Sequence, residues 1–298
     1  MQEEFFETKI KPINIPLDVP FDKKEDYLLN YKKTTFENKG MFIMAGDQRI
    51  EHLNKDFFGK DISQDDATPE HLFKIAQNVE GIVLAVQLGL ISSFADNYRE
   101  IYYLVKLNSK TDLLKGEEPL SELLNSVSDV VALQKESNLN IVGVGYTIYL
   151  GSTFESKMLK EATQAIKEAH QNGLLVVLWI YPRGKAIKDE KNPDLLAGAV
   201  AVAGVLGADF IKLQFPEKKR ALKKFLSQAV KTAGHCKIVS AGGEAVKPEK
   251  YLKRIKDQLQ LGSFGVAVGR NLHQKGLEEA IEFARAIKKT ILNHPAYR

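Results

Sequence analysis

The feature that most constrains the fold is a series of eight short apolar runs, separated by longer segments with a helical period. Near-continuous apolar runs are typical of strands that are buried on both faces, as in a parallel sheet. The intervening pattern is clearest in residues 154–172, whose apolar side chains recur on one face of a helix. The expected strands are residues 41–47, 81–87, 102–108, 140–146, 174–181, 209–215, 237–243 and 264–270.

Eight strands that alternate with helices over roughly 250 residues predict an α/β fold, a single (β/α)8 (TIM) barrel. The alternative with the same alternation is an open doubly wound sheet. The barrel is favoured because the unit count is eight and because no Gly-x-Gly-x-x-Gly motif follows the first run. We expect residues 1–40 to form an N-terminal extension that packs on the barrel, and residues 41–298 to form the barrel itself.

Composition narrows the class of protein. The chain is 44% hydrophobic and 27% charged, as in soluble globular proteins, and its formal charge of +4 suits small anions without indicating nucleic acid. The single cysteine, Cys236, excludes an internal disulfide and indicates a reducing compartment. The N-terminus lacks the apolar core of a signal peptide, and the longest weakly polar stretch, residues 195–208, is too short to span a membrane. We expect a cytoplasmic protein without membrane association.

Polar or glycine residues finish several of the expected strands, and a barrel carries its active site at this end. Side chains alternate between the faces of a strand, so Trp179, Tyr181 and Arg183 share one face if the strand stays regular. If such faces point inward, one pocket holds an amine, a phenol, a guanidinium and a carboxylate. The candidate site residues are Asp47, Trp179, Tyr181, Arg183, Lys212, Gly242, Gly243, Gly269 and Arg270.

Lys212 lies in the run Asp-Phe-Ile-Lys-Leu-Gln-Phe, although lysine is rarely buried without compensation. A dry pocket disfavours the charged form, so the neutral amine can attack a carbonyl and form a Schiff base. The alternative is a lysine with a buried stem whose ammonium pairs with a carboxylate such as Asp47. Lys106 lies in a similar run, and the pattern alone does not separate the two lysines.

Tyr181 is a candidate general acid or base, since Arg183 and a nearby lysine would ease its ionisation. The alternative is an aromatic side chain that fills the barrel and finds a hydrogen-bond partner. The glycines that follow the seventh and eighth strands, together with Arg270, favour a phosphate site, because barrels often bind phosphate there. Lone glycines after strands are otherwise common in turns.

Metal and nucleic-acid sites are not indicated. The six histidines show neither His-x-Glu nor His-x3-His spacing, and a catalytic zinc site needs about three clustered ligands, so we expect no metal. The basic residues of segment 218–224 are interpreted as a solvated helix face, without the interleaved aromatics that favour nucleic acid.

Five segments, in the same order, resemble the archaeal-type class I fructose-bisphosphate aldolases, within the wider group that includes deoxyribose-phosphate aldolase. The resemblance implies a class I lyase that needs neither metal nor cofactor and reversibly cleaves fructose 1,6-bisphosphate to dihydroxyacetone phosphate and glyceraldehyde 3-phosphate. Such an enzyme would serve glycolysis and gluconeogenesis, and the family implies a homo-oligomer. The segments are Met-Ala-Gly-Asp-Gln-Arg-Ile-Glu-His (44–52), Trp-Ile-Tyr-Pro-Arg-Gly (179–184), Phe-Ile-Lys (210–212), Ala-Gly-Gly (241–243) and Val-Gly-Arg-Asn (268–271).

The resemblance also implies a role for each candidate residue. Lys212, rather than Lys106, would form the Schiff base with the ketose or with dihydroxyacetone phosphate. Tyr181 would transfer protons, and Asp47 would orient hydroxyls or assist that transfer. The substrate-binding residues would be Trp179 and Arg183 in the pocket wall, with Gly242, Gly243, Gly269 and Arg270 around a phosphate.

Two segments depart from the family pattern. The family has an aromatic residue before the first aspartate and His-Gly after it, where this chain has Gly46 and Gln48-Arg49. After the lysine the family continues with a Tyr-Thr-Gly type of loop, where this chain has residues 213–216, Leu-Gln-Phe-Pro. Both changes bear on the choice of substrate, and Arg49 is a candidate for a second anion contact. The alternatives are a Schiff-base lyase or transaldolase for another phosphorylated sugar, and a non-catalytic phosphosugar-binding barrel.

Overall fold

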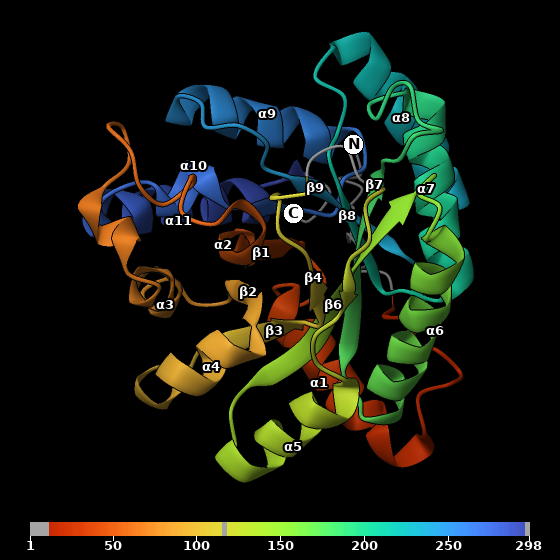
Figure 1. Cartoon of the computed structure of the whole chain (residues 1–298), viewed down its shortest axis with the longest axis horizontal. Helices are drawn as coiled ribbons and strands as arrows, with labels where there is room; N and C mark the ends of the chain where they lie inside the picture. The colour runs from red at the N-terminus through yellow and green to blue at the C-terminus, as the bar shows by residue number, and fades with distance from the viewer. Residues whose placement is uncertain (1–11, 115–117, 296–298) are drawn as a thin grey trace, which may run out of the picture.

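Eight parallel strands close into a barrel in the computed structural model, which describes residues 12–114 and 118–295 (Figure 1). The order around the barrel is β1-β10-β9-β8-β7-β6-β3-β2, and a separate antiparallel pair joins β4 (Asn108–Ser109) to β5 (Glu122–Leu123). The predicted (β/α)8 barrel is therefore confirmed. The barrel strands are β1 (Met41–Ala45), β2 (Val83–Gln87), β3 (Tyr102–Lys106), β6 (Ile141–Leu150), β7 (Leu175–Pro182), β8 (Phe210–Leu213), β9 (Lys237–Ala241) and β10 (Gly265–Val268).

Helices follow the strands and surround the barrel (Figure 1). Their apolar faces are buried against the strands, as Met158, Ala162 and Ile166 are in α6. None of the described helices is long and apolar enough to cross a membrane. The surrounding helices are α3 (Glu70–Gln77), α4 (Leu88–Phe94), α5 (Val127–Ser137), α6 (Glu155–Gln171), α7 (Pro193–Leu206), α8 (Lys219–Thr232), α9 (Pro248–Gln260) and α11 (Leu277–Leu292). Shorter elements are α1 (Lys24–Thr34), α2 (Gln48–His52), α10 (Arg270–His273) and the 3-10 turns η1 (Phe21–Lys23), η2 (Gln64–Ala67) and η3 (Ala95–Asn97).

The alternation of side chains along the strands divides the core into two apolar clusters. One lies between the strands and the helices, and the other fills the inside of the barrel. The inner cluster contains Ile43, Val83, Val177, Trp179 and Phe210. Residues two positions further along these strands point the same way, so the polar side chains at the carboxyl ends continue an inward-facing column.

The amino-terminal end of the barrel is covered by α1. Tyr27 and Tyr31 of α1 belong to the inner cluster, and Tyr31 stacks on Phe210 with ring centroids 5.5 Å apart. Asn30 Nδ2 donates a hydrogen bond of 2.9 Å to the carbonyl of Gly173, just before β7. Residues 1–11 of the expected extension lie outside the described part of the chain, and the boundary at residue 40 stays a prediction.

A buried ionic network fastens the segment before α1 to the barrel. His170 of α6 lies between two carboxylates, with Nδ1 2.9 Å from Asp18 and Nε2 3.3 Å from Asp209. The Tyr27 hydroxyl donates to Asp209 at 2.5 Å. Burial disfavours a charged imidazole, but the bonds and charges of Asp209 and Asp18 outweigh it and raise the pKa of His170 to about 9.

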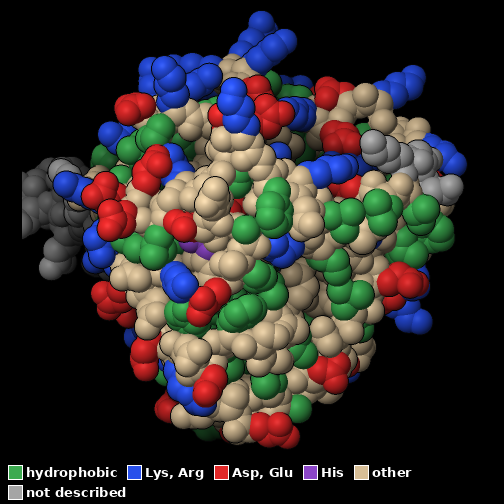
Figure 2. Space-filling model, turned by 60° about the vertical axis from the view of Figure 1, so that its left-hand side comes forward, with side chains coloured by type: hydrophobic (Ala, Val, Ile, Leu, Met, Phe, Trp, Pro, Cys, Tyr) green, Lys and Arg blue, Asp and Glu red, His purple; other side chains and the backbone are tan. Residues whose placement is uncertain are grey.

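Acidic and basic side chains are interspersed on the face of the molecule that Figure 2 shows, with apolar side chains between them. A surface that binds nucleic acid is typically a stripe or patch of basic residues. The prediction that the protein does not bind nucleic acid stays a prediction, and the mixed charge of this face is compatible with it.

Replacing His170 with glutamine should remove a pH dependence from the stability of the fold. Because the folded pKa of His170 is raised, its stabilisation is complete below about pH 6.5 and is lost as the pH rises through about 9. Over this window the free energy of unfolding of the wild type should fall by roughly 2 kcal/mol relative to His170→Gln. Urea unfolding of both proteins at the two ends of the window measures this difference, and a difference independent of pH would contradict the network's role.

Candidate active site

All nine predicted site residues line one cavity at the carboxyl end of the barrel, with a volume of about 160 Å³. The cavity brings together the ends of β1, β7, β8, β9 and β10, which lie far apart in the sequence. Five polar lining residues were not among the predicted ones. They are Gln48, Glu51, His52, Thr147 and Gln214.

Strand register positions the Trp179 side chain at the centre of this end of the barrel. Trp179 pairs with Thr147 of β6 on one side and with Lys212 of β8 on the other. Gly145 of β6 makes room for the indole, because a Cβ at this position would lie 2.4 Å from ring atom Cζ3 of Trp179. The same Cβ would lie 3.2 Å from Cδ of Lys106. A glycine in the strand is therefore a requirement of this packing.

Two buried lysines flank the indole. The Nζ atom of Lys212 lies 4.9 Å from the centre of the Trp179 ring, and that of Lys106 lies 5.1 Å from it. Lys212 is 5% exposed and Lys106 is 2% exposed. An ammonium over an indole is attracted by the ring's quadrupole, so Trp179 offsets part of the cost of burying these charges.

The hydrogen bonds of the two lysines distinguish them. Lys106 Nζ donates to the carbonyl of Asn108 at 3.1 Å, to its Oδ1 at 3.0 Å and to Thr147 Oγ1 at 2.7 Å. Lys212 has no hydrogen bond and no ion pair within 4.0 Å to any residue in the described part of the chain. A contact ion pair between Lys212 and Asp47, the alternative raised by the sequence, is therefore not observed.

Burial lowers the pKa of both lysines. The pKa of Lys106 falls to about 8, with the charge of Lys212 adding to the effect of burial and Asp47 opposing it. Burial also lowers the pKa of Lys212, against the attraction of Asp47 and Glu51. Lys212 is thus a buried amine with a weakened affinity for its proton and no hydrogen-bond partner, which is the state that a nucleophilic lysine needs.

Tyr181 is held as a neutral phenol. Burial raises its pKa, the charges of Asp47 and Glu51 raise it further, and Arg183 opposes them only in part. Arg183 does lower the pKa of Tyr181, as expected, but no lysine is among the causes, and desolvation and two carboxylates outweigh the guanidinium. The Tyr181 ring stacks on Tyr149 with centroids 6.1 Å apart. A phenol in this state can donate a proton.

Asp47 supplies a carboxylate to the same cavity. Its Oδ1 is buried and has no hydrogen-bond partner among the described residues, whereas its main-chain carbonyl accepts a bond of 3.1 Å from Gln87 Nε2. The carboxylate acts electrostatically on Lys106, Lys212 and Tyr181. It is available to accept a hydrogen bond from a ligand hydroxyl.

Two glycine segments and the guanidinium of Arg270 form another wall of the cavity, and Arg254, which lines a neighbouring cavity, contacts the same glycines. Gly242 and Gly243 follow β9, and Gly243 has a φ of +70°. Arg254 Nη1 donates to the carbonyl of Gly242 at 3.3 Å, and Arg270 Nη2 donates to that of Gly243 at 3.4 Å. This wall therefore combines exposed backbone with positive charge, which suits an anion.

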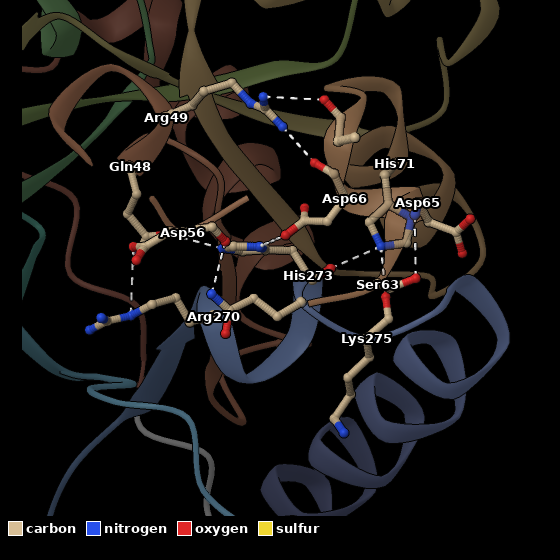
Figure 3. A network of polar contacts seen from close by, with 12 residues as sticks. Gln48, Arg49, Asp56, Ser63, Asp65, Asp66, His71, Arg270, His273 and Lys275 are labelled. Carbon is tan, nitrogen blue, oxygen red and sulfur yellow. Dashed lines mark hydrogen bonds and ion pairs between the residues drawn. The ribbon is translucent and has the colours of Figure 1, made fainter. Parts of the chain in front are cut away.

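Two other arginines that the sequence indicated, Arg183 and Arg49, bind partners other than these glycines. Arg183 binds Glu190 through Nε at 3.0 Å and Nη2 at 3.2 Å, and it also lines a neighbouring cavity of about 910 Å³. Arg49 points away from the site: Nη2 donates to the carbonyl of Asp66 at 2.7 Å, and the guanidinium lies 3.9 Å above the Phe57 ring (Figure 3). The expected anion contact from Arg49 is therefore wrong, since local acceptors bind its guanidinium.

The fourth strand was predicted to end at Tyr146, and this is wrong. β6 runs on to Leu150, and the Tyr146 hydroxyl donates to Glu161 of α6 at 2.6 Å, on the outside of the barrel. Thr147 lines the cavity instead, and Tyr149 stacks on Tyr181. The β-branched and aromatic residues of segment 147–150 carry the signal that would have extended the strand.

Among the residues that the structure describes, one group of side chains could offer ligand atoms to a metal: Glu51, His52 and Asp112, whose ligand atoms lie within 4.8 Å of one another. These groups already have partners. His52 Nδ1 lies 2.5 Å from Asp56, and Lys110 Nζ lies 2.9 Å from Asp112. We assign no metal to this group, and the absence of a metal cofactor stays a prediction.

Trp179 is the only tryptophan of the chain, so its fluorescence should report on the lysines beside it. Deprotonation of Lys106 removes a charge 5.1 Å from the ring, and the emission should change with a midpoint near pH 8. Lys106→Met should abolish this step, whereas Lys135→Met, at an exposed position of α5, should leave it unchanged. A step near pH 8 that survives Lys106→Met would show that another group titrates there.

The chain resembles known aldolases over most of its length. Residues 41–275 match the model of a family described as DeoC/LacD family aldolase. A relative from Methanocaldococcus jannaschii, named fructose-bisphosphate aldolase/6-deoxy-5-ketofructose 1-phosphate synthase, is 49% identical over 280 residues, which is 94% of this chain and 90% of the relative.

Two solved structures share the fold. A fructose-bisphosphate aldolase from Slackia heliotrinireducens superposes with a TM-score of 0.91 at 44% identity, covering 96% of this chain and 92% of that one. An archaeal fructose-1,6-bisphosphate aldolase, described with its catalytic lysine covalently bound to the carbinolamine intermediate of the substrate, gives a TM-score of 0.77 at 31% identity, covering 89% and 99%. The five matching segments and these similarities agree, and the chain belongs to the DeoC/LacD family of aldolases.

Proposed function

We propose that this protein is a class I aldolase that reversibly cleaves fructose 1,6-bisphosphate to dihydroxyacetone phosphate and glyceraldehyde 3-phosphate. The observation that carries the proposal is the state of Lys212, a buried amine with a lowered pKa and no hydrogen bond to the described residues. The names of the relatives from M. jannaschii and S. heliotrinireducens support the same reaction.

Lys212 is the proposed nucleophile. Its neutral amine adds to the C2 carbonyl of the ketose, and loss of water from the carbinolamine leaves a protonated imine. The imine withdraws the electron pair of the C3–C4 bond, which breaks to give the aldehyde and an enamine bound to Lys212. Protonation of C3 and hydrolysis of the imine then release dihydroxyacetone phosphate. The imine serves as the electron sink, so the reaction as proposed requires no metal.

Two groups are proposed to move the protons. The cleavage takes one proton from the C4 hydroxyl and adds one at C3, so the site needs an acceptor and a donor. Asp47 has an unpartnered carboxylate oxygen and suits the hydroxyl, while Tyr181 is a phenol with a raised pKa and suits the donation to C3. Lys106 is proposed to contribute positive charge to the site and not to transfer a proton, since its Nζ donates hydrogen bonds to Asn108 and Thr147.

The remaining residues are proposed to bind the substrate. The backbone of Gly242, Gly243 and Gly269 and the guanidinium of Arg270 would hold one phosphate. Trp179 would form the wall against which the imine lies. Arg183 would face the far end of the sugar, where the cavity opens towards the larger neighbouring one.

A second activity, the synthesis of 6-deoxy-5-ketofructose 1-phosphate named for the M. jannaschii relative, is a further candidate. By its name this product lacks a phosphate at its far end. The Arg183–Glu190 ion pair favours the candidate, because a far end without charge can be accommodated while the pair stays intact. A phosphate at that end would instead compete with Glu190 for Arg183.

The same proposal includes four further points. They are location in the cytoplasm, assembly into a homo-oligomer, the division of the chain at residue 40 and the absence of a cofactor. They rest on the composition and on the family resemblance. A transaldolase for another phosphorylated sugar and a non-catalytic phosphosugar-binding barrel are the outcomes that would replace it.

Borohydride reduction in the presence of dihydroxyacetone phosphate should attach a covalent adduct to Lys212, measured as added mass on its peptide. Lys212→Ala should abolish the adduct and lower kcat for fructose 1,6-bisphosphate by on the order of 1,000-fold or more, because the neighbouring amine, Lys106, is held by hydrogen bonds to Asn108 and Thr147. Lys106→Met is the matched control, since it removes the neighbouring amine and should retain the adduct. Full activity in Lys212→Ala would exclude the mechanism, and an adduct without cleavage would favour a transaldolase.

Glu190→Gln should release Arg183 for a phosphate at the far end of the substrate. Because the Arg183–Glu190 pair is half exposed, its strength is small, and KM for fructose 1,6-bisphosphate should fall by about 2- to 5-fold. KM for fructose 1-phosphate, which has no phosphate at that end, should not change. An equal change for both substrates would show that Glu190 acts elsewhere.

A further inference from the structure

The side chain of Gln48 lies flat against Gly269 in the glycine wall of the cavity. A Cβ at Gly269 would lie 2.5 Å from both Nε2 and Oε1 of Gln48, so any other residue there would displace the amide. Gln48 lines the cavity, and its Nε2 has no hydrogen-bond partner among the described residues. The glycine at position 269 thus admits a side-chain donor beside the backbone of the proposed phosphate site.

A buried histidine–aspartate pair holds the other end of this amide (Figure 3). Nε2 of His273 lies 3.3 Å from Oε1 of Gln48, and Nδ1 of His273 lies 2.7 Å from Oδ2 of Asp66. Asp66 and His273 are both 0% exposed. The partner atom at each ring nitrogen is an oxygen, the carboxylate of Asp66 at Nδ1 and the amide oxygen of Gln48 at Nε2, so the geometry pairs each nitrogen with an acceptor.

The pair is fixed from several sides. The His273 ring stacks on Phe57 with centroids 4.9 Å apart. The guanidinium of Arg49 also packs on Phe57, with its Cζ 3.9 Å from the centroid of the Phe57 ring. His71 Nε2 lies 3.0 Å from the carbonyl of His273. The charged groups around the pair are Arg49, bound to the carbonyl of Asp66, and the more distant Asp56 and Arg270. A ring held in this way cannot turn to a different partner.

The direction of these bonds determines which end of the Gln48 amide faces the cavity. With a donor at His273 Nε2, the oxygen of the amide is held and the –NH2 group remains for a ligand. With an acceptor at His273 Nε2, the amide would reverse and turn its oxygen towards the ligand. An amide nitrogen favours a phosphoryl oxygen, and an amide oxygen repels it.

We propose that Gln48 is a phosphate-binding residue and that the buried Asp66–His273 pair is a positioning device that keeps its –NH2 group turned into the cavity. The proposal rests on the proposed function, since it deepens the phosphate site at Gly269 and Arg270. It also assigns a role to Gln48, which stands where the family pattern has a histidine after the first aspartate. Arg49, the other residue of that departure, serves by bracing the pair.

The test compares dihydroxyacetone phosphate with dihydroxyacetone, which carries the same carbonyl and no phosphate. The concentration that gives half-maximal borohydride trapping at Lys212 is measured for each, and their ratio reports on the phosphate alone. Gln48→Leu should raise the value for dihydroxyacetone phosphate by roughly 10-fold, the effect of losing one hydrogen bond to a charged group. It should leave the value for dihydroxyacetone within about 2-fold. Gln274→Leu is the matched control, because Gln274 follows His273 and binds the carbonyl of Asp56 but does not line the cavity.

The positioning role is tested by a double-mutant cycle. Asp66→Asn removes the carboxylate acceptor that orients the His273 ring through Nδ1, so it should raise the same ratio, and it should add nothing in the presence of Gln48→Leu. If Asp66→Asn does not fold, Gly269→Ala replaces it. The alanine expels the amide and should weaken phosphate binding when Gln48 is present, but not in a Gln48→Ala background.

The outcomes separate this proposal from the proposed function. An unchanged ratio in Gln48→Leu, or an Asp66→Asn effect that persists in the double mutant, would overturn the inference while trapping at Lys212 stands. Calorimetric titration with inorganic phosphate gives a reading that does not depend on Lys212. If the wild type forms no adduct, the aldolase proposal fails, yet weaker phosphate binding by Gln48→Leu than by wild type and Gln274→Leu would still support the role of Gln48.

Discussion

The structure depends on two ammonium groups that share one buried indole. Removing an ammonium from water is costly, and the barrel meets this cost in different ways for its two lysines. Lys106 is compensated by three hydrogen bonds, whereas Lys212 has the Trp179 ring and the distant charges of Asp47 and Glu51. Among the described residues, no hydrogen-bond partner holds the proton of Lys212.

The networks of polar contacts lie outside this apolar column. His170 with Asp18 and Asp209 lies at the amino-terminal end, and His273 with Asp66 lies beside the carboxyl end. Both pair a buried imidazole with a carboxylate, and both tie a segment that is not part of the barrel to a barrel element. The first network secures α1, and the second secures the loop between α2 and α3 against α10. In both networks a histidine and a carboxylate join segments that are far apart in the sequence.

The sequence predicted the fold well because alternation of apolar runs and helices is a strong local signal. It predicted which residues line the cavity because the carboxyl ends of parallel strands must meet at one end of a barrel. It failed where tertiary contacts decide the outcome. The direction of Arg49 depends on the carbonyls of Asp66 and Ala67, and the neutral state of Tyr181 depends on how deeply it is buried. Neither can be read from the residues beside them.

Gln48 was missed for a related reason. A carboxylate just after a strand, as at Asp47, indicates a site residue. A glutamine in a short helix does not indicate one. Only the contact with Gly269, more than two hundred residues later, distinguishes it. The two lysines illustrate the same limit, since Lys106 and Lys212 occupy similar apolar runs and differ only in partners supplied by other strands.

The stacking of Tyr31 on Phe210 connects α1 with the surroundings of Lys212 as well as with the stability of the fold. Phe210 lies two residues before Lys212 on the same inward face of β8. The ring on which α1 packs and the reactive amine are therefore neighbouring side chains inside the barrel. If α1 lifted away, water would enter beneath Lys212 and restore the ordinary hold of its nitrogen on a proton. By covering the amino-terminal end of the barrel, α1 completes the apolar layer that lies beneath Lys212.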